Sequence, residues 1–298
     1  MVARLAVLPA IAAGATSELV AVASRDSYGA GFEPYHRLLA DPSVEAVYLP
    51  LPNSLHCEWT MRAAEAGKHV LCEKPLARSA AEAHTMLTAC EAAGVVLMEA
   101  YMTPFHPRAV TLSELVAGAG LGELRFGRST FTFTHRDPAD HRWRPEMGGG
   151  ALLDVGVYCL APLVDAAGRL PVAVAAAQVR AGSGVDASFS GWLDFGAGAT
   201  GVFTASFEAP ERQHLELTGT SATVLVDDAF AAGAGGQRGR LLHADGRIEE
   251  LAGADDDPYR RMVEHFDGVV RGQVEAIRPP SASVELLGVV DRLREAAA

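Results

Sequence analysis

The stretch Cys72-Glu73-Lys74-Pro75 ends a short apolar run, His69–Cys72, whose composition is typical of a buried β-strand. Outward from it, apolar runs alternate with helical segments, which end at a glycine or begin at a capping-box pair. The predicted strands are Glu18–Ala23, Ala46–Leu49, His69–Cys72 and Val95–Met98, and the predicted helices are Ser54–Ala66 and Ser79–Ala93. Because this alternation requires crossover connections, the sequence predicts an α/β fold here, a doubly wound, Rossmann-like parallel sheet.

A different pattern begins after Pro104. A helix around Arg108–Val116 and a long strand, Glu123–Thr134, precede a glycine triplet and an apolar helix at about Leu152–Ala166. Further strands are predicted at Val172–Val179, Ala187–Phe195, Thr200–Phe207, His214–Thr218 and Ala222–Val226. A loop at Ala231–Gly239, a helix that starts at Asp257-Pro258 and a helix at Val284–Ala297 complete the chain. We interpret this half as an α+β domain with an open, mostly antiparallel sheet, which gives predicted domains at residues 1–103 and 104–298.

The composition indicates a reduced globular protein. Hydrophobic residues make up 49% of the chain, and the formal net charge of −12 disfavours nucleic acid as a partner. Because Cys57, Cys72, Cys90 and Cys159 show neither metal-ligand nor disulfide spacing, we expect no metal and a cytoplasmic location. We find no apolar run long enough to cross a bilayer, and we expect no membrane partner.

The segment Met1–Ser17 has two interpretations. It is either an amphipathic helix, with Leu5, Leu8, Ile11 and Ala12 on one face, or a poor secretory signal. The second interpretation would make the chain an exported binding protein without a cofactor.

Three stretches place polar side chains where α/β proteins bind ligands. Lys74 follows a predicted strand, and open α/β sheets bind ligands at the carboxyl ends of their strands. Asp154 and Tyr158 are four residues apart and so share one helix face. The third stretch, Pro50–His56, leads from a strand into a helix. The structural alternatives are a solvated lysine, an aspartate that only favours the helix dipole and a tyrosine in the core.

These stretches resemble the Gfo/Idh/MocA oxidoreductase family. The matching motifs are EKP at Glu73–Pro75, the LPNSLH turn at Leu51–His56 and the segment GGGALLDVGVY at Gly148–Tyr158. Tyr158 stands where other members carry His, which resembles the subset of sugar 3-ketoreductases, NADP-dependent aldose dehydrogenases and dihydrodiol dehydrogenases. The resemblance implies an NAD(P)-dependent oxidoreductase that transfers a hydride between a nicotinamide cofactor and a sugar or sugar-like alcohol or ketone.

The resemblance also implies roles for individual residues. Lys74 would contact the nicotinamide ribose and the reacting oxygen, and Tyr158 would transfer the proton. A neighbouring lysine cation lowers a tyrosine pKa from its ordinary value of about 10 and stabilises a developing alkoxide. Substrate contacts are implied for Asp154, Tyr101 and His106, and cofactor contacts for Leu51, Pro52, Asn53, His56, Glu73, Lys74, Glu99, Trp143 and Arg144.

The choice of cofactor depends on the tip of the first predicted strand. The chain reads Ser24-Arg25-Asp26 there. An arginine at this place accommodates the 2′-phosphate of NADP, whereas an acidic residue favours the ribose of NAD. We therefore expect NADP, contacted by Ser24 and Arg25, with NAD as the alternative.

The chain departs from the family pattern in its first third. The first strand and the glycine-rich turn of the family have no counterpart, and only Ser27–Phe32 fills the place of a further helix and strand. Three explanations are open: a start codon placed too late, another subunit that completes the sheet, or a non-catalytic relative that kept the substrate domain and lost cofactor binding. If one face of the open sheet in the second half lacks helices, its apolar side chains must pack against another surface. We therefore expect a homodimer or homotetramer formed through this sheet.

Overall fold

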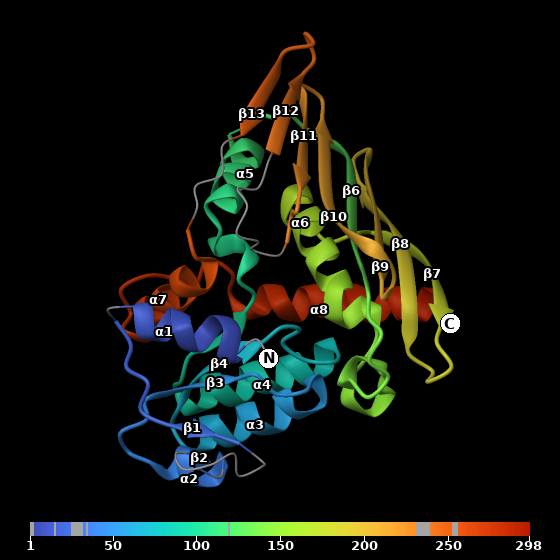
Figure 1. Cartoon of the computed structure of the whole chain (residues 1–298). Coiled ribbons are helices and arrows are strands. Elements are labelled where there is room, and N and C mark those ends of the chain that lie inside the picture. Colours follow the sequence, from blue (N-terminus) through green and yellow to red (C-terminus); the bar gives the residue numbers. More distant parts are fainter. Residues whose placement is uncertain are drawn as a thin grey trace. The chain divides into compact units, whose positions relative to one another are not determined.

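The computed structural model describes residues 3–14, 16–24, 32–33, 35–118, 120–230, 239–251 and 256–298. The chain divides into two compact units; the first contains two small sheets and the second contains one large sheet, each with helices (Figure 1). The first comprises Met1–Met102 and Asp257–Val284, and the second comprises Thr103–Asp256 and Glu285–Ala298. The domains predicted from the sequence, 1–103 and 104–298, differ from these units in the segment Asp257–Val284, which groups with the first unit.

The first unit contains a parallel sheet in the order β3-β4-β5, with α3 and α4 packed beside each other as the crossover helices (Figure 1). The bounds are β3 (Ala46–Leu49), α3 (Asn53–Glu65), β4 (His69–Glu73), α4 (Ala80–Ala93) and β5 (Leu97–Ala100). Because all three strands are parallel, their carboxyl ends lie at one edge of the sheet. The predicted Rossmann-like arrangement is confirmed, although β5 lies closer to the C-terminus than the strand predicted at Val95–Met98.

Local signals set the helix ends of this unit. At the start of α4, Ser79 Oγ accepts a hydrogen bond from Glu82 N (3.3 Å), and at its end Gly94 has φ +67°. At the start of α7 (Pro258–Val270), Asp257 Oδ1 accepts one from Tyr259 N (2.9 Å). These contacts join residues two to three positions apart, so the sequence alone predicts them.

The N-terminal part of the first unit is helical, as one interpretation of Met1–Ser17 predicted, but its first strand is shorter than predicted. The π-helical turn η1 (Ala3–Val7) and α1 (Leu8–Ala13) pack against α7, and the strand predicted at Glu18–Ala23 is reduced to β1 (Val22–Ala23). β1 pairs in parallel with β2 (Phe32–Glu33), and α2 (Tyr35–Ala40) follows. β1 and β3 thus each form the edge of a separate sheet, and both line a cavity of about 710 Å³. Most of Ser27–Phe32 lies outside the described residues.

The second unit is built on an eight-stranded sheet in the order β13-β12-β11-β10-β6-β9-β8-β7. Only β6 and β9 are parallel to each other among the pairs of this sheet, so the predicted open, mostly antiparallel sheet is confirmed. The bounds are β6 (Leu124–Thr134), β7 (Ala173–Arg180), β8 (Asp186–Gly196), β9 (Ala199–Ser206), β10 (Glu208–Gly219), β11 (Ala222–Asp227), β12 (Gly239–His243) and β13 (Ile248–Leu251). No strand was predicted at β12 or β13, and most of the predicted loop Ala231–Gly239 lies outside the described residues.

Helix α6 (Val157–Ala167) packs on strands β6 and β9 of this sheet (Figure 1). It continues the π-helical turn η5 (Leu152–Gly156), and α5 (Pro107–Ala117) and most of α8 (Pro280–Ala296) also belong to this unit. One helical stretch of the described residues, Pro145–Ala167, is long and apolar enough to span a membrane, contrary to the sequence analysis. Its apolar window is 67% buried inside the protein, as expected for a core helix.

Candidate functional site

The carboxyl ends of β3 and β4 are joined by a buried histidine. His56, fully buried on α3, contacts Leu51 O through Nε2 (2.8 Å) and Pro75 O through Nδ1 (2.9 Å). Burial lowers the pKa of His56, although the two carbonyls act against this shift. His56 therefore holds the turns after both strands together, a supporting role at the edge where Lys74 lies.

The Glu73 carboxylate accepts hydrogen bonds from residues of its own unit. Its Oε1 accepts a hydrogen bond from the Tyr48 hydroxyl (2.6 Å), and its Oε2 accepts one from Lys74 N (3.2 Å). Burial raises the pKa of Glu73, whereas the Tyr48 hydroxyl and the Lys74 cation oppose this shift. Burial and the nearby Glu73 charge raise the pKa of Tyr259 to about 12. The Glu73 carboxyl thus fixes the backbone of Lys74 from directly beside it.

Glu99 and Tyr101, at the end of β5, are similarly engaged. Glu99 accepts hydrogen bonds from Leu76 N (2.8 Å) and Ser283 Oγ (2.6 Å), which tie the loop after Lys74 to the segment that begins α8. Tyr101 is 6% exposed, and the Arg278 guanidinium lies over its ring at 5.7 Å. A cofactor contact for Glu99 and a substrate contact for Tyr101 stay predictions.

Ser24 and Leu51 both line the 710 Å³ cavity of the first unit. Pro52 is the N-cap residue of α3 and makes no side-chain capping bond, and Asn53 is the first residue of that helix. The N-terminus of α3 therefore directs main-chain N–H groups toward the same edge of the sheet as Lys74. Arg25, the second residue predicted to contact the NADP phosphate, lies outside the described residues.

In the second unit, the glycine triplet permits a close backbone approach. A Cβ on Gly149 would lie 2.4 Å from Arg142 O, and a Cβ on Gly150 would lie 2.1 Å from the Asp186 carboxylate, so both places exclude a side chain. Asp186 Oδ2 accepts a hydrogen bond from Leu152 N (2.6 Å) at the start of the helix that carries Asp154 and Tyr158. Burial raises the pKa of Asp186, and the Leu152 N–H opposes this shift. The triplet thus docks the start of this helix onto the sheet.

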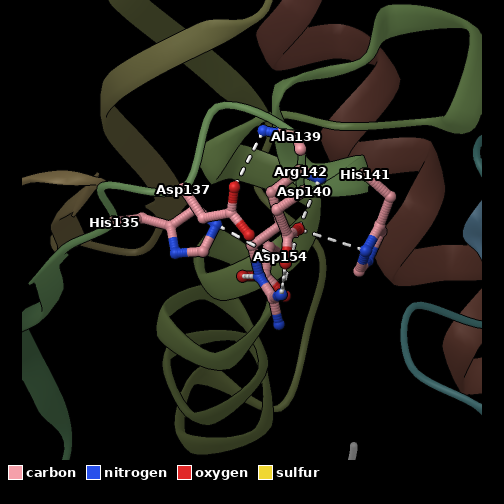
Figure 2. A network of polar contacts seen from close by, with 7 residues as sticks. All are labelled: His135, Asp137, Ala139, Asp140, His141, Arg142 and Asp154. Atoms are coloured by element: carbon pink, nitrogen blue, oxygen red, sulfur yellow. Dashed lines mark hydrogen bonds and ion pairs between the residues drawn. The ribbon is translucent and has the colours of Figure 1, made fainter.

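Asp154 is bound by Arg142, a residue that the sequence analysis missed. Arg142 Nε donates to Asp154 Oδ2 (2.6 Å), and the two side chains are 29% and 14% exposed. Figure 2 shows Arg142 between two carboxylates: its Nη1 also lies 3.3 Å from Asp140 Oδ1. His141 Nδ1 lies 3.1 Å and His135 Nε2 lies 3.6 Å from the Asp140 carboxylate. Asp154, Arg142 and Asp140 form a polar network that fixes the Asp154 carboxylate in one orientation.

Tyr158 is held by aromatic rings. The ring of Phe131 lies 5.6 Å from it, edge-on, and the ring of Phe230 lies 6.1 Å from it. Phe131 and Phe230 in turn stack on each other at 5.6 Å. Tyr158 itself is half-buried, so its ring is packed while part of its side chain reaches the surface of its own unit.

The remaining predicted residues lie elsewhere in the second unit. Trp143 stacks on His135 (centroids 6.0 Å apart) and borders a hollow of about 320 Å³, whereas Arg144 is exposed. His106 is 9% exposed and caps α5, since its Nδ1 accepts a hydrogen bond from Arg108 N (3.2 Å). Their cofactor and substrate contacts stay predictions. Among the described residues, no cluster of three or more His, Cys, Asp or Glu side chains could hold a metal ion.

The first unit contains features that fit a nicotinamide dinucleotide. The carboxyl ends of β3, β4 and β5 converge, Lys74 follows β4, and the N-terminus of α3 faces the same edge. Such an edge binds dinucleotides in parallel α/β sheets. The residues present therefore fit a dinucleotide cofactor.

Comparison with known proteins agrees with this fit. Residues 5–101 match an oxidoreductase family with an NAD-binding Rossmann fold, and residues 109–225 match the GFO/IDH/MocA C-terminal domain. D-xylose 1-dehydrogenase (NADP⁺) 2 of Haloferax volcanii is 36% identical over 98% of this chain and 93% of its own length. A dTDP-3,4-didehydro-2,6-dideoxy-α-D-glucose 3-reductase of Saccharopolyspora spinosa is 36% identical over 89% of this chain and 83% of its own length.

Solved structures show the same fold. An aldose-aldose oxidoreductase of Caulobacter crescentus, complexed with glycerol, has a TM-score of 0.91 at 28% identity and covers 99% of this chain and 93% of its own. A 3-ketoreductase of Actinomadura kijaniata, in complex with NADP and TDP-benzene, has a TM-score of 0.90 at 28% identity and covers 99% of this chain and 94% of its own.

The fold and these matches define an NAD(P)-dependent oxidoreductase that acts on CH–OH groups. The chain belongs to the Gfo/Idh/MocA family, as its EKP and GGGALLDVGVY motifs predicted. The relatives also confirm the predicted cofactor, NADP. The xylose dehydrogenase is named for NADP⁺, and the 3-ketoreductase structure contains NADP.

Proposed function

We propose that this chain is an NADP-dependent sugar oxidoreductase in which Lys74 and Tyr158 serve the same hydride-transfer reaction. The observation that carries the proposal is the pair of positioned motifs: Lys74 beside the bound Glu73 carboxyl, and Tyr158 on a helix docked by the glycine triplet. The names of relatives, a xylose dehydrogenase and a sugar 3-reductase, support a sugar as substrate.

The roles follow from the chemistry of each group. The bound cofactor would donate or accept the hydride at a carbon that bears oxygen. The Tyr158 hydroxyl would then give a proton to that oxygen or take one from it, and the Lys74 cation would stabilise negative charge that develops there. Asp154, fixed by Arg142, would accept hydrogen bonds from substrate hydroxyl groups.

Two further features belong to the same proposal. One face of strands β7 and β8 carries two exposed apolar residues, Val179 (60%) and Trp192 (40%), which the strand register places on the same side. Such a surface on an open sheet suits self-association, so we propose a homodimer or homotetramer formed through this sheet.

Four free cysteines, three of them buried, suit the reducing cytoplasm, which we propose as the location.

Titration with NADPH, followed by nicotinamide fluorescence, is the direct test. We expect saturable binding that is tighter for NADPH than for NADH, followed by NADP⁺ reduction with D-xylose or another aldose. Absence of binding at millimolar NADPH would instead favour a non-catalytic relative that keeps the substrate domain but has lost cofactor binding. Analytical ultracentrifugation at micromolar concentration tests the oligomer, and a monomeric mass would overturn that part.

A further inference from the structure

The turn Asp228–Phe230, which follows β11, is bound at nearly every main-chain group. We propose that this turn is the positioning element of Tyr158: it presses the Phe230 ring against Tyr158 and thereby fixes where the tyrosine hydroxyl lies. The inference rests on the proposed role of Tyr158 in proton transfer. Neither Phe230 nor its anchors touch the reactants in this scheme, so they are positioning residues.

The first anchor is a buried arginine. Arg108 is 5% exposed, and its Nη2 donates to Ala229 O (2.9 Å) and to Asp228 O (3.4 Å). Burial lowers the pKa of Arg108 to about 10, with the Asp228 charge acting against this shift. Among the described residues, the buried Nη1 of Arg108 has no hydrogen-bond partner. Burial of a guanidinium with an unsatisfied N–H is costly. The two hydrogen bonds to the carbonyls of the turn offset part of this cost and hold those carbonyls in place.

The second anchor comes from β10 and from the start of the unit. Gln213, 5% exposed, accepts hydrogen bonds from Asp228 N at its main-chain oxygen (3.0 Å) and from Phe230 N at Oε1 (3.2 Å). Thr103 Oγ1 donates to Phe230 O (3.3 Å). The turn is thereby held in a conformation in which Asp228 has φ +52°, a value that residues other than glycine adopt at a cost.

The constraint reaches Tyr158 through aromatic packing. Phe230 is 2% exposed and stacks on Phe131 with an interplanar angle of 19°. Both rings contact Tyr158, so its side chain has aromatic neighbours from β6 and from the turn. Helix α6 fixes the backbone of Tyr158, whereas rotation about the Cα–Cβ bond of its side chain would move the hydroxyl. Because a misplacement of about 1 Å can cost about a hundredfold in rate, these rings restrict a motion to which catalysis is sensitive.

The experiment compares Phe230→Leu with a matched control, Phe189→Leu. Phe189 is also buried (1% exposed) and stacked, on Phe203, but lies in a different aromatic pair of the same unit. With D-xylose and NADP⁺ we expect Phe230→Leu to lower kcat about tenfold, with KM values changed less than about twofold. Phe189→Leu should lower the melting temperature similarly and leave kcat near the original value. Arg108→Met should act in the same direction as Phe230→Leu, but more weakly. Equal effects of both leucine variants on kcat would overturn the proposal.

A double-mutant cycle separates this inference from the proposed function. If Phe230 acts through Tyr158, Phe230→Leu should have no further effect on the residual rate of Tyr158→Phe. The same loss in both backgrounds would overturn the positioning role. Near-original activity in Tyr158→Phe alone would overturn the proposed function instead.

A second measurement needs no substrate. In protein labelled with 3-fluorotyrosine, the ¹⁹F signal that disappears in Tyr158→Phe identifies this residue among the six tyrosines. Phe230→Leu should shift or broaden that signal, and Phe189→Leu should leave it unchanged. An unmoved signal in Phe230→Leu would overturn the inference even if no sugar is turned over.

Discussion

Glu73 and Asp154 are both carboxylates beside the residues proposed to perform the chemistry, but the two units hold them by opposite means. In the first unit, Glu73 is bound by a neutral phenol, Tyr48, and by a main-chain N–H, and burial raises its pKa. In the second unit, Asp154 is bound by the Arg142 guanidinium, which also contacts Asp140. The Glu73 side chain is therefore held by burial and neutral donors, and the Asp154 side chain by an ion pair, so the two should respond differently to substitution and to pH.

The largest expected effect comes from removing one reactive group from each unit. We predict that Lys74→Ala and Tyr158→Phe each lower kcat/KM by about 10² to 10⁴, because charge stabilisation and proton transfer contribute on that scale. The double variant should be little slower than the slower single variant, since groups that act in one step are not additive. Steady-state kinetics with NADP⁺ and D-xylose measure this, with Tyr35→Phe as the control. Additive losses would indicate separate roles for the two units.

The second prediction concerns the charged network alone. Arg142→Met should lower kcat/KM for the sugar about tenfold or more, mainly through a higher KM, because the Asp154 carboxylate loses its charge-assisted hydrogen bond. NADPH affinity should stay unchanged. Arg136→Met, an exposed arginine in the same loop, is the matched control and should behave like the original protein. If both variants behave alike, Arg142 does not position Asp154.

The third prediction uses pH to separate the two carboxylate environments. The pKa of Glu73 is raised above 4.5 in the folded protein, so its contribution to stability is present below 4.5 and is lost as pH rises through the raised value. Glu73→Gln should therefore unfold at a higher temperature than the original protein at neutral pH. This advantage should shrink as pH falls toward 4.5.

Asp140 should show the opposite sign. Burial alone would raise its pKa, but the N–H and guanidinium of Arg142 and the nearby histidines hold it below 3.8. Its contribution to stability is present above 3.8 and is lost as pH falls through the lowered value. Asp140→Asn should therefore unfold at a lower temperature at neutral pH, with a deficit that shrinks in acid. Thermal unfolding of both variants across this pH range tests the pair, and parallel curves would contradict the contrast.

Features of the fold that depend on residues close in sequence were predicted, whereas a strand that depends on its partner strand was not. The capping box at Ser79 and the Asp257 cap depend on contacts within three residues, and both were predicted. The strand Ile248–Leu251 (IEEL) was missed because it has two central charges and is exposed at most positions, so its pairing with β12 rather than its own pattern makes it a strand.

The candidate site shows the same limit. Its motif residues were recognisable, but the partners that hold them were not. Arg142 lies twelve residues before Asp154, and nothing in their spacing indicates an ion pair. Likewise, the cofactor contacts of Glu99 and His56 stay predictions, and the spacing did not reveal that their side chains bind main-chain groups and Ser283 within their own unit. Such bonds form between segments that only the tertiary structure brings together. The spacing of residues along a single sequence does not reveal them.

The smallest expected effect sharpens the contrast in packing between the two units. Ala46 lies on β3 and lines the 710 Å³ cavity, whereas Ala205 on β9 is fully buried in a core cluster with Val155 and Phe207. Ala46→Val should stabilise the protein by up to about 1 kcal/mol, because a β-branched side chain suits a strand and the cavity has room for it. Ala205→Val should destabilise it by about 1–3 kcal/mol, because the core around it is full. Urea unfolding gives both values. A loss at Ala46 as large as that at Ala205 would mean that the cavity cannot accept even two methyl groups in solution, and that the first unit is packed as densely as the second.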